Sequence, residues 1–113
     1  MKFPKTARLL TRGQFQKILR EGRRLTGRVV SIQYMCKDTT QNPKLGVTIS
    51  KKFGKSHIRN RFKRVVREAF REISSELPSG LELHVLPRTP PLQIKKQDVL
   101  LDLRQIQSKI TIN

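Results

Sequence analysis

The chain has 113 residues and a mass of 13.2 kDa, which fits one small domain spanning residues 1–113. It carries 25 Lys and Arg against 8 Asp and Glu, for a formal net charge of +17 and a pI near 11.4. Self-repulsion of this size destabilises a compact fold, so the composition disfavours a free-standing metabolic enzyme and favours a polyanionic partner. Leu, Ile, Val and Phe supply 34 residues, enough for a modest core and too many for a disordered chain.

Several other classes of protein are disfavoured. The single cysteine, Cys36, cannot form an internal disulfide and is expected to be a small buried apolar group. The apolar runs are far shorter than the roughly 20 residues that cross a bilayer, and no signal peptide is visible, so we expect a cytoplasmic protein without membrane contact. His84 is expected to lie at the surface. Neither His57 nor His84 has cysteine or carboxylate residues at metal-ligand spacing, and no catalytic arrangement is visible, so we expect no metal site and no catalytic residue on the protein.

The positive charge is concentrated in one part of the chain. Residues 1–67 hold 19 of the 25 basic residues and two of the eight acidic ones, whereas residues 68–113 hold six of each sign. A solubility device would be spread evenly, so this asymmetry favours a binding surface.

The first element is predicted to be a short helix after a basic arm at residues 1–10. Thr11 has the position of a capping residue and Gln14 can reach back to it, while Gly22 ends the helix after Glu21.

Two strands are predicted over 28–37 and 44–52, where apolar residues alternate with others. A turn at 41–43 separates them, so we expect an antiparallel pair. A third strand is predicted over 81–85.

The main helix is predicted over 57–75, with Ser56 as its cap. Its apolar stripe comprises Ile58, Phe62, Val65, Val66, Ala69, Phe70 and Ile73. The face opposite the stripe carries Asn60, Arg64, Arg67 and Arg71. With a last helix over 97–110, the order of elements indicates an α+β two-layer domain whose helices cover one face of a small sheet.

The segment 51–67 is the strongest candidate site. It could be an ordinary solvated helix face, but its like charges three and four residues apart have no carboxylate to relieve them. Phosphate contact explains it better, because arginine forks and a helix N-terminus both bind phosphate oxygens. Asn60 could cap, bridge to the backbone or read a base or ribose edge. Phe15 and Tyr34 could belong to the core or could line a groove for unpaired bases.

The sequence Lys51-Lys52-Phe53-Gly54, followed by Ile58-Arg59-Asn60-Arg61-Phe62-Lys63-Arg64, resembles the RNR motif of the bacterial ribonuclease P protein subunit. The preceding segment 46–50 is similar to the strand that leads into that motif. Arg8-Leu9 and Gln14-Phe15-Gln16-Lys17 are similar to the N-terminal helix motif of the family. The resemblance covers nearly the whole chain, and its specific part is residues 46–67.

The resemblance implies an α/β sandwich like ribosomal protein S5 domain 2, with a small mixed sheet, a central basic helix and a left-handed βαβ crossover. It implies a protein that assists a catalytic RNA in removing the 5′ leader of precursor tRNA and does no chemistry alone. Mg²⁺ is held mainly by the RNA, and no organic cofactor is implied. The expected partners are ribonuclease P RNA and precursor tRNA, with the free protein a monomer that binds the RNA one to one.

The resemblance also implies residue roles. The residues expected to contact the catalytic RNA are Lys51, Lys52, Lys55, Arg59, Asn60, Arg61, Lys63, Arg64 and Arg67. Those expected in the leader cleft are Arg8, Arg12, Phe15, Leu19 and Tyr34. Leu19 departs from the family, which usually has an aromatic residue there. The alternatives are a structural RNA-binding protein, such as a ribosomal component, and a nuclease that works without RNA.

Overall fold

The computed structural model describes residues 12–38 and 40–112. Helices and strands are both present there, so the predicted α+β class is confirmed. The α-helices are α2 (Arg12–Glu21), α3 (Ser56–Ile73) and α4 (Lys96–Ile112), and the strands are β1 (Arg23–Thr26), β2 (Val30–Cys36), β3 (Lys44–Val47) and β4 (Leu81–Pro87). Short 3-10 turns are η1 (Lys51–Phe53), η2 (Ser74–Glu76) and η3 (Pro91–Gln93).

The four strands form one mixed sheet in the order β1-β2-β4-β3. β2 pairs antiparallel with β1 and β4, whereas β3 pairs parallel with β4. The predicted antiparallel pairing of segments 28–37 and 44–52 is therefore wrong. It fails because the chain leaves β3 through α3 and returns as β4, which lies between β2 and β3.

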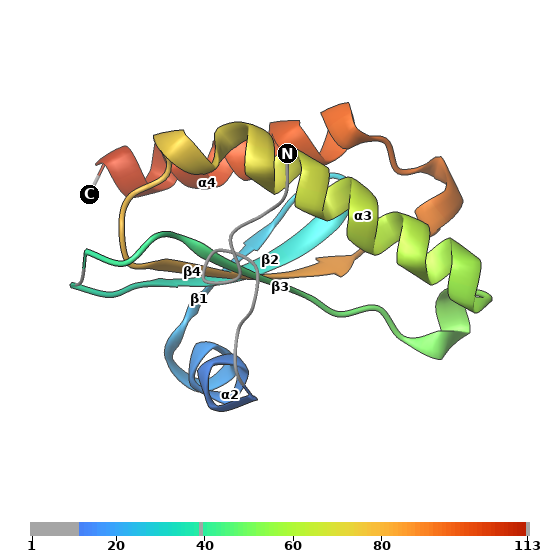
Figure 1. Cartoon of the computed structure of the whole chain (residues 1–113), viewed down its shortest axis with the longest axis horizontal. Helices are drawn as coiled ribbons and strands as arrows, with labels where there is room; N and C mark the ends of the chain where they lie inside the picture. The colour runs from blue at the N-terminus through green and yellow to red at the C-terminus, as the bar shows by residue number, and fades with distance from the viewer. Residues whose placement is uncertain (1–11, 39, 113) are drawn as a thin grey trace.

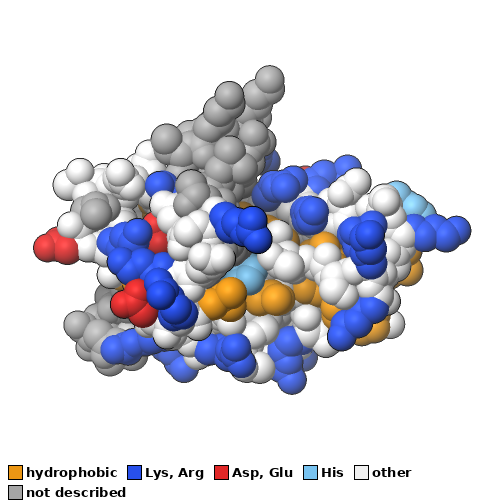
Figure 2. Space-filling model, turned by 90° about the horizontal axis from the view of Figure 1, so that it is seen from below, with side chains coloured by type: hydrophobic (Ala, Val, Ile, Leu, Met, Phe, Trp, Pro, Cys, Tyr) orange, Lys and Arg blue, Asp and Glu red, His pale blue; other side chains and the backbone are white. Residues whose placement is uncertain are grey.

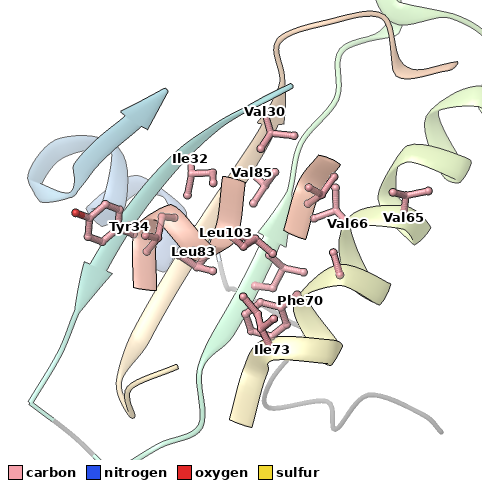
Figure 3. Packing of buried hydrophobic residues seen from close by; sticks show 14 of the residues in the cluster. Val30, Ile32, Tyr34, Val65, Val66, Phe70, Ile73, Leu83, Val85 and Leu103 are labelled. Atoms are coloured by element: carbon pink, nitrogen blue, oxygen red, sulfur yellow. The ribbon is translucent and has the colours of Figure 1, made fainter. Parts of the chain in front are cut away.

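The connection from β3 through α3 to β4 is a βαβ crossover. In Figure 3 the helices lie toward the viewer, both strands run upward and β4 is to the left of β3. This arrangement is left-handed, as the resemblance implies, whereas most such crossovers are right-handed.

Helices lie on both sides of the sheet. α3 and α4 cover one face, and α2 lies on the other (Figure 1). The prediction that all helices cover one face is thus wrong for α2. Among the side chains of α2 that the structure describes, Ile18 is the one that is fully buried, and it does not belong to the main core.

The main core lies between the sheet and the α3–α4 layer (Figure 3). The predicted stripe of α3 is confirmed, since Phe62, Val66 and Phe70 are fully buried. Their spacing of about one turn places them on a single face. They meet alternate residues of β2 and β4, including Ile32 and Leu83.

The ends of two elements differ from the prediction. The strand predicted to reach residue 52 ends at Val47, and α3 starts one residue early, at Ser56. The N-cap is Lys55, which makes no side-chain capping bond. The predicted cap role of Ser56 is therefore wrong, because its Oγ instead accepts from Arg59 Nη2 at 3.3 Å.

The end of α2 agrees with the prediction. Gly22 follows the last helical residue, and its N–H donates to the carbonyl of Ile18 at 2.8 Å. A Cβ at this glycine would lie 2.9 Å from the Tyr34 carbonyl oxygen, so the chain turns here at a site that excludes a side chain. The turn leads directly into β1, which the sequence analysis missed.

A buried carboxylate fixes the hairpin between β1 and β2. Asp102 of α4 is fully buried and accepts hydrogen bonds from three successive backbone N–H groups. The donors are Arg28 at 2.9 Å, Val29 at 3.0 Å and Val30 at 3.1 Å. These bonds join the C-terminal helix to the sheet and satisfy the turn's backbone.

Candidate nucleic-acid interface

The outward face of α3 carries exposed polar and cationic side chains. Asn60, Arg64 and Arg67 are exposed there, opposite the buried stripe. The ion pairs of the described residues join Lys37 to Glu82, Lys96 to Glu72 and Arg104 to Glu76. Within that part of the chain, no cation between residues 51 and 67 is paired with an acidic side chain.

The two arginines of the RNR segment are partly engaged within the protein. Arg59 is half-buried, and its Nε donates to the carbonyl of Gly54 at 3.2 Å. Arg61 is half-buried on the other side of α3, where one nitrogen, Nη1, donates to the carbonyls of Pro91 and Ile94 at 3.1 and 3.2 Å. Arg59 therefore holds the turn before α3, and Arg61 holds η3.

The segment before α3 presents three more cations. Lys51, Lys52 and Lys55 are exposed, while Lys63 on the helix is half-buried. The Ser50 hydroxyl accepts the Lys52 N–H at 3.2 Å, which orders η1. Gly54 then has a φ of +132°, a conformation that favours glycine. We call the exposed cations of this turn and of the following helix the α3 surface (residues 51–67).

The opposite side of the sheet carries α2. Arg12 and Leu19 are exposed on this helix, and Leu19 has 58% of its surface accessible. Gln14 Nε2 donates to Glu82 Oε2 of β4 at 3.2 Å, which ties α2 to the sheet. The predicted cleft residue Arg8 and the side chain of Phe15 lie outside the described residues.

Tyr34 does not belong to this side. It is 8% exposed and packs in the main core with Val30 and Ile32, as Figure 3 shows. Residues two apart on a strand share a face, so Tyr34 points toward α3 and α4 and away from α2. Its assignment to the leader cleft is therefore wrong.

The residues that do occupy this side were missed by the sequence analysis. They are the side chains that alternate with the core positions of β2 and β4, namely Gln33, Glu82 and His84, together with Thr48 after β3. We call this surface the α2 face. Figure 2 views the molecule from this side and shows a band of hydrophobic side chains with Lys and Arg along both borders.

His84 is buried rather than at the surface, contrary to the prediction. Its Nδ1 lies 3.1 Å from Gln33 Oε1, and its Nε2 lies 2.7 Å from Thr48 Oγ1. Burial lowers the pKa of His84 below its usual 6.5, which favours a neutral ring at pH 7. Cys36 was expected to be buried, but it is exposed at the end of β2, so that prediction is wrong.

The described residues contain neither a metal-binding cluster nor a membrane-spanning helix. Among residues 12–38 and 40–112, no group of three or more His, Cys, Asp or Glu could hold a metal ion. None of the helices in the described part of the chain combines the length and apolar character that a bilayer span requires. The exposed cations described above can thus bind and orient a polyanion.

Comparison with known proteins fits this geometry. The family model for ribonuclease P matches residues 3–111. The chain belongs to the ribonuclease P protein family. It is thus a protein component of ribonuclease P, an endoribonuclease of tRNA processing, and its partner is ribonuclease P RNA.

Individual members of the ribonuclease P protein family give the same result. The component from Chlamydia trachomatis serovar L2 is 47% identical over 85 residues, which cover 75% of this chain and 70% of the relative. The component from Chlamydia felis is 44% identical over 102 residues, covering 90% and 72%. The solved ribonuclease P protein from Thermotoga maritima has a TM-score of 0.76 at 28% identity, covering 90% of this chain and 96% of that one. A Staphylococcus aureus ribonuclease P protein shares the fold, with a TM-score of 0.77 at 24% identity over 94% of this chain and 96% of that one.

Proposed function

We propose that this protein binds ribonuclease P RNA through the α3 surface and the 5′ leader of precursor tRNA through the α2 face. In this proposal the catalytic RNA cuts the phosphodiester at the mature 5′ end, and the protein is a non-catalytic subunit. One protein monomer joins one RNA, and the assembly acts in the cytoplasm.

The observation that carries the proposal is the unneutralised charge of the α3 surface. Arg64 and Arg67 project from a helix whose other side is locked in the core, so they are held at fixed spacing. Guanidinium groups bind phosphate oxygens through planar forks, and pairing them with RNA relieves their mutual repulsion. Asn60 lies among them as an exposed amide able to contact a base or ribose edge.

Arg59 and Arg61 act differently in this proposal. Each has part of its guanidinium bonded to backbone carbonyls, which fixes the η1 turn and η3 beside the helix. Their remaining donors can still face RNA. We therefore assign them a positioning role together with any phosphate contact, whereas Arg64 and Arg67 are contact residues.

The leader is proposed to bind the α2 face. A single strand binds to apolar platforms with cations beside them, and Figure 2 shows an apolar band with Lys and Arg along both borders of this face. Exposed Leu19 and Arg12 contribute one apolar contact and one charge. A leucine packs against a base without stacking as an aromatic ring does, so leader affinity depends more on the apolar band of the α2 face.

Mg²⁺ supplies phosphate neutralisation and activation of water for hydrolysis when it is bound to the RNA. The described residues do not provide a ligand set that fits a resident divalent ion. The protein's own contribution is electrostatic, because its +17 charge offsets the repulsion between two RNA molecules.

A reconstitution assay tests the proposal. The protein is mixed with ribonuclease P RNA and precursor tRNA at low Mg²⁺, and appearance of the mature 5′ end is followed. We expect faster cleavage than with RNA alone, and no cleavage by protein from which all RNA has been removed. An unchanged rate would favour a ribosomal-type structural protein, and cleavage without RNA would indicate a self-sufficient nuclease.

A second measurement tests the proposed binding of the leader. Affinity of the assembled complex is measured for precursor tRNA and for mature tRNA without a leader. The proposal expects the protein to tighten binding of the precursor selectively. Equal tightening of both would confine the protein's role to the catalytic RNA.

A further inference from the structure

The two histidines of the chain are in opposite situations. His57 is the second residue of α3 and is exposed, and its ring makes no hydrogen bond or ion pair with another described residue. His84 is buried with a side chain at each ring nitrogen, and burial lowers its pKa, which favours the neutral ring. Of the two imidazoles, the one of His57 is therefore available to a ligand that approaches from outside.

His57 lies in line with an outward arginine of α3. At about 100° per residue, a spacing of seven residues brings His57 and Arg64 to within roughly 20° of the same direction around the helix axis. A rise of 1.5 Å per residue places them about 10 Å apart along that axis. The exposed Asn60 lies between them on the same side of the helix. His57 therefore belongs to the α3 surface by position, although it carries no permanent charge.

The charged groups on the elements next to His57 are mostly cations. They are Lys51 and Lys52 of η1, Lys55 at the N-cap of α3, and Arg59, Arg61, Lys63 and Arg64 of the helix itself. Arg61 joins α3 to η3, and η3 contains no charged residue. These neighbours offer no negative group to a protonated imidazole.

The acidic side chains of the two adjoining helices are placed elsewhere. On α3 the first one is Glu68, about three turns beyond His57. On α4 the first one is Asp98, which accepts the N–H of the exposed Lys95 at 3.0 Å. A positive charge on His57 thus lacks a carboxylate partner among the described residues, and a phosphate from outside would supply the missing counter-charge.

Protonation changes what an imidazole can offer to a phosphate. The neutral ring has one N–H donor, whereas the protonated ring has two donors and a positive charge. A charge-assisted hydrogen bond to phosphate therefore favours the protonated form. Histidine side chains change between the two forms between about pH 5 and 8. By linkage, if protonation of the ring tightens RNA binding by some factor, RNA binding tightens proton binding by the same factor.

We propose that His57 is a further phosphate contact of the α3 surface and that it binds as the imidazolium, so that RNA binding takes up a proton from the solvent. This inference rests on the proposed binding of ribonuclease P RNA to the α3 surface, and it adds a titratable contact to the permanently charged ones. The proton comes from the buffer and stays on the ring while the phosphate is bound. The affinity for RNA should therefore rise as the pH falls through the range in which imidazoles titrate.

The test is the pH dependence of RNA binding. The dissociation constant for ribonuclease P RNA is measured from about pH 5.5 to about pH 7.5 at constant ionic strength. We expect the wild type to bind about 3- to 5-fold tighter at the acidic end, the range of one exposed ion pair. His57→Gln should lose this dependence and bind as weakly as the wild type does at the neutral end. His57→Lys should also lose it, and should bind as tightly as the wild type does at the acidic end.

Arg64→Gln is the matched control, because it removes a permanent charge from the same line of α3. It should weaken RNA binding at every pH and keep the wild-type ratio between the two ends of the range. Calorimetry in two buffers of different ionisation enthalpy counts the protons taken up on binding. The uptake should be larger for the wild type and Arg64→Gln than for His57→Gln and His57→Lys, since proton uptake by the RNA itself is common to all four. Thermal unfolding shows that each exposed substitution leaves the fold intact.

The outcomes separate this inference from the proposed function. Equal proton uptake by the wild type and His57→Gln would overturn it, and so would a pH dependence that survives in His57→Gln. If Arg64→Gln still weakens RNA binding in that case, the α3 surface stands without its titratable contact. If the wild type does not bind ribonuclease P RNA, or if neither substitution changes the affinity at any pH, both proposals fail.

Discussion

At the scale of single residues, Asp102 is the contact on which the arrangement of sheet and helices depends most. Its carboxylate is fully buried and takes part in none of the ion pairs of the described residues, and three backbone N–H groups donate to it. Gly27 lies against it so closely that a Cβ there would overlap the carboxylate. The hairpin and α4 are therefore fitted to each other at this one point.

We predict that Asp102→Asn lowers the free energy of unfolding by about 2–4 kcal/mol, because an amide presents N–H groups to backbone donors and loses charge-assisted bonds. Gly27→Ala should cost a similar amount. The double variant should cost less than the sum, since both changes break the same clamp. Urea denaturation measures the free energy of unfolding of the two single variants and of the double variant.

Asp98 on the same helix provides the control. It accepts only the exposed Lys95 N–H at 3.0 Å, as an N-terminal capping contact. Asp98→Asn should therefore cost about 0.5–1 kcal/mol, in the range of a helix cap. Equal losses for the two aspartates would mean that the Asp102 clamp contributes no more than a surface cap.

Residue roles were predictable where side-chain periodicity alone determines them. The outward positions of Arg64 and Arg67 follow from the spacing of the α3 stripe. The same rule indicated that Tyr34 shares a face with Val30 and Ile32, but the family resemblance outweighed it and gave the wrong side. The roles of Gln33 and His84 depend on a pairing between strands 51 residues apart, which a single sequence does not specify.

At the scale of elements, α3 was predicted well because its long amphipathic pattern is local. β1 was missed because its residues, Arg23–Thr26, contain a single apolar side chain, and its position depends on pairing with β2. The antiparallel pairing of β2 and β3 was wrong for a related reason. A crossover can insert a later strand between two earlier ones, and nothing within those two strands records it.

The cationic residues of α3 should divide into two groups by experiment. We predict that Arg61→Gln lowers the free energy of unfolding by about 1–3 kcal/mol, because it removes two hydrogen bonds to the carbonyls of η3. Arg64→Gln should leave stability nearly unchanged, since its side chain is exposed and makes no described ion pair. Gln matches Arg closely in helix propensity, so backbone preference is held constant.

The salt dependence of RNA binding tests whether Arg64 and Arg67 contact phosphates. Loss of one phosphate contact reduces the slope of log affinity against log salt by about 0.7–0.9. We expect this reduction for Arg64→Gln and for Arg67→Gln. Slopes equal to that of the wild type in both variants would remove these two arginines from the contact surface.

At the scale of the whole molecule, binding and stability make opposite demands on the same charge. The net charge of +17 is carried by a domain with a radius of gyration of 13.1 Å. Cations at this density repel one another, and salt screens the repulsion over about 10 Å at 0.1 M. The RNA-free protein should therefore be least stable at low ionic strength and should gain stability when anions occupy the α3 surface.

The double variant Arg64→Gln/Arg67→Gln tests whether the same charges weaken the fold and strengthen RNA binding. It removes two like charges from one helix face, so at low salt its unfolding temperature should exceed that of the wild type by about 2–4 °C, as expected for roughly 0.5 kcal/mol in a domain of this size. Its affinity for ribonuclease P RNA should fall at the same time. Added sodium chloride should raise the unfolding temperature of the wild type more than that of the variant, until the two converge. A variant that is less stable than the wild type at low salt would show that these arginines are already neutralised within the protein, and the charge of the α3 surface could then no longer be attributed to RNA.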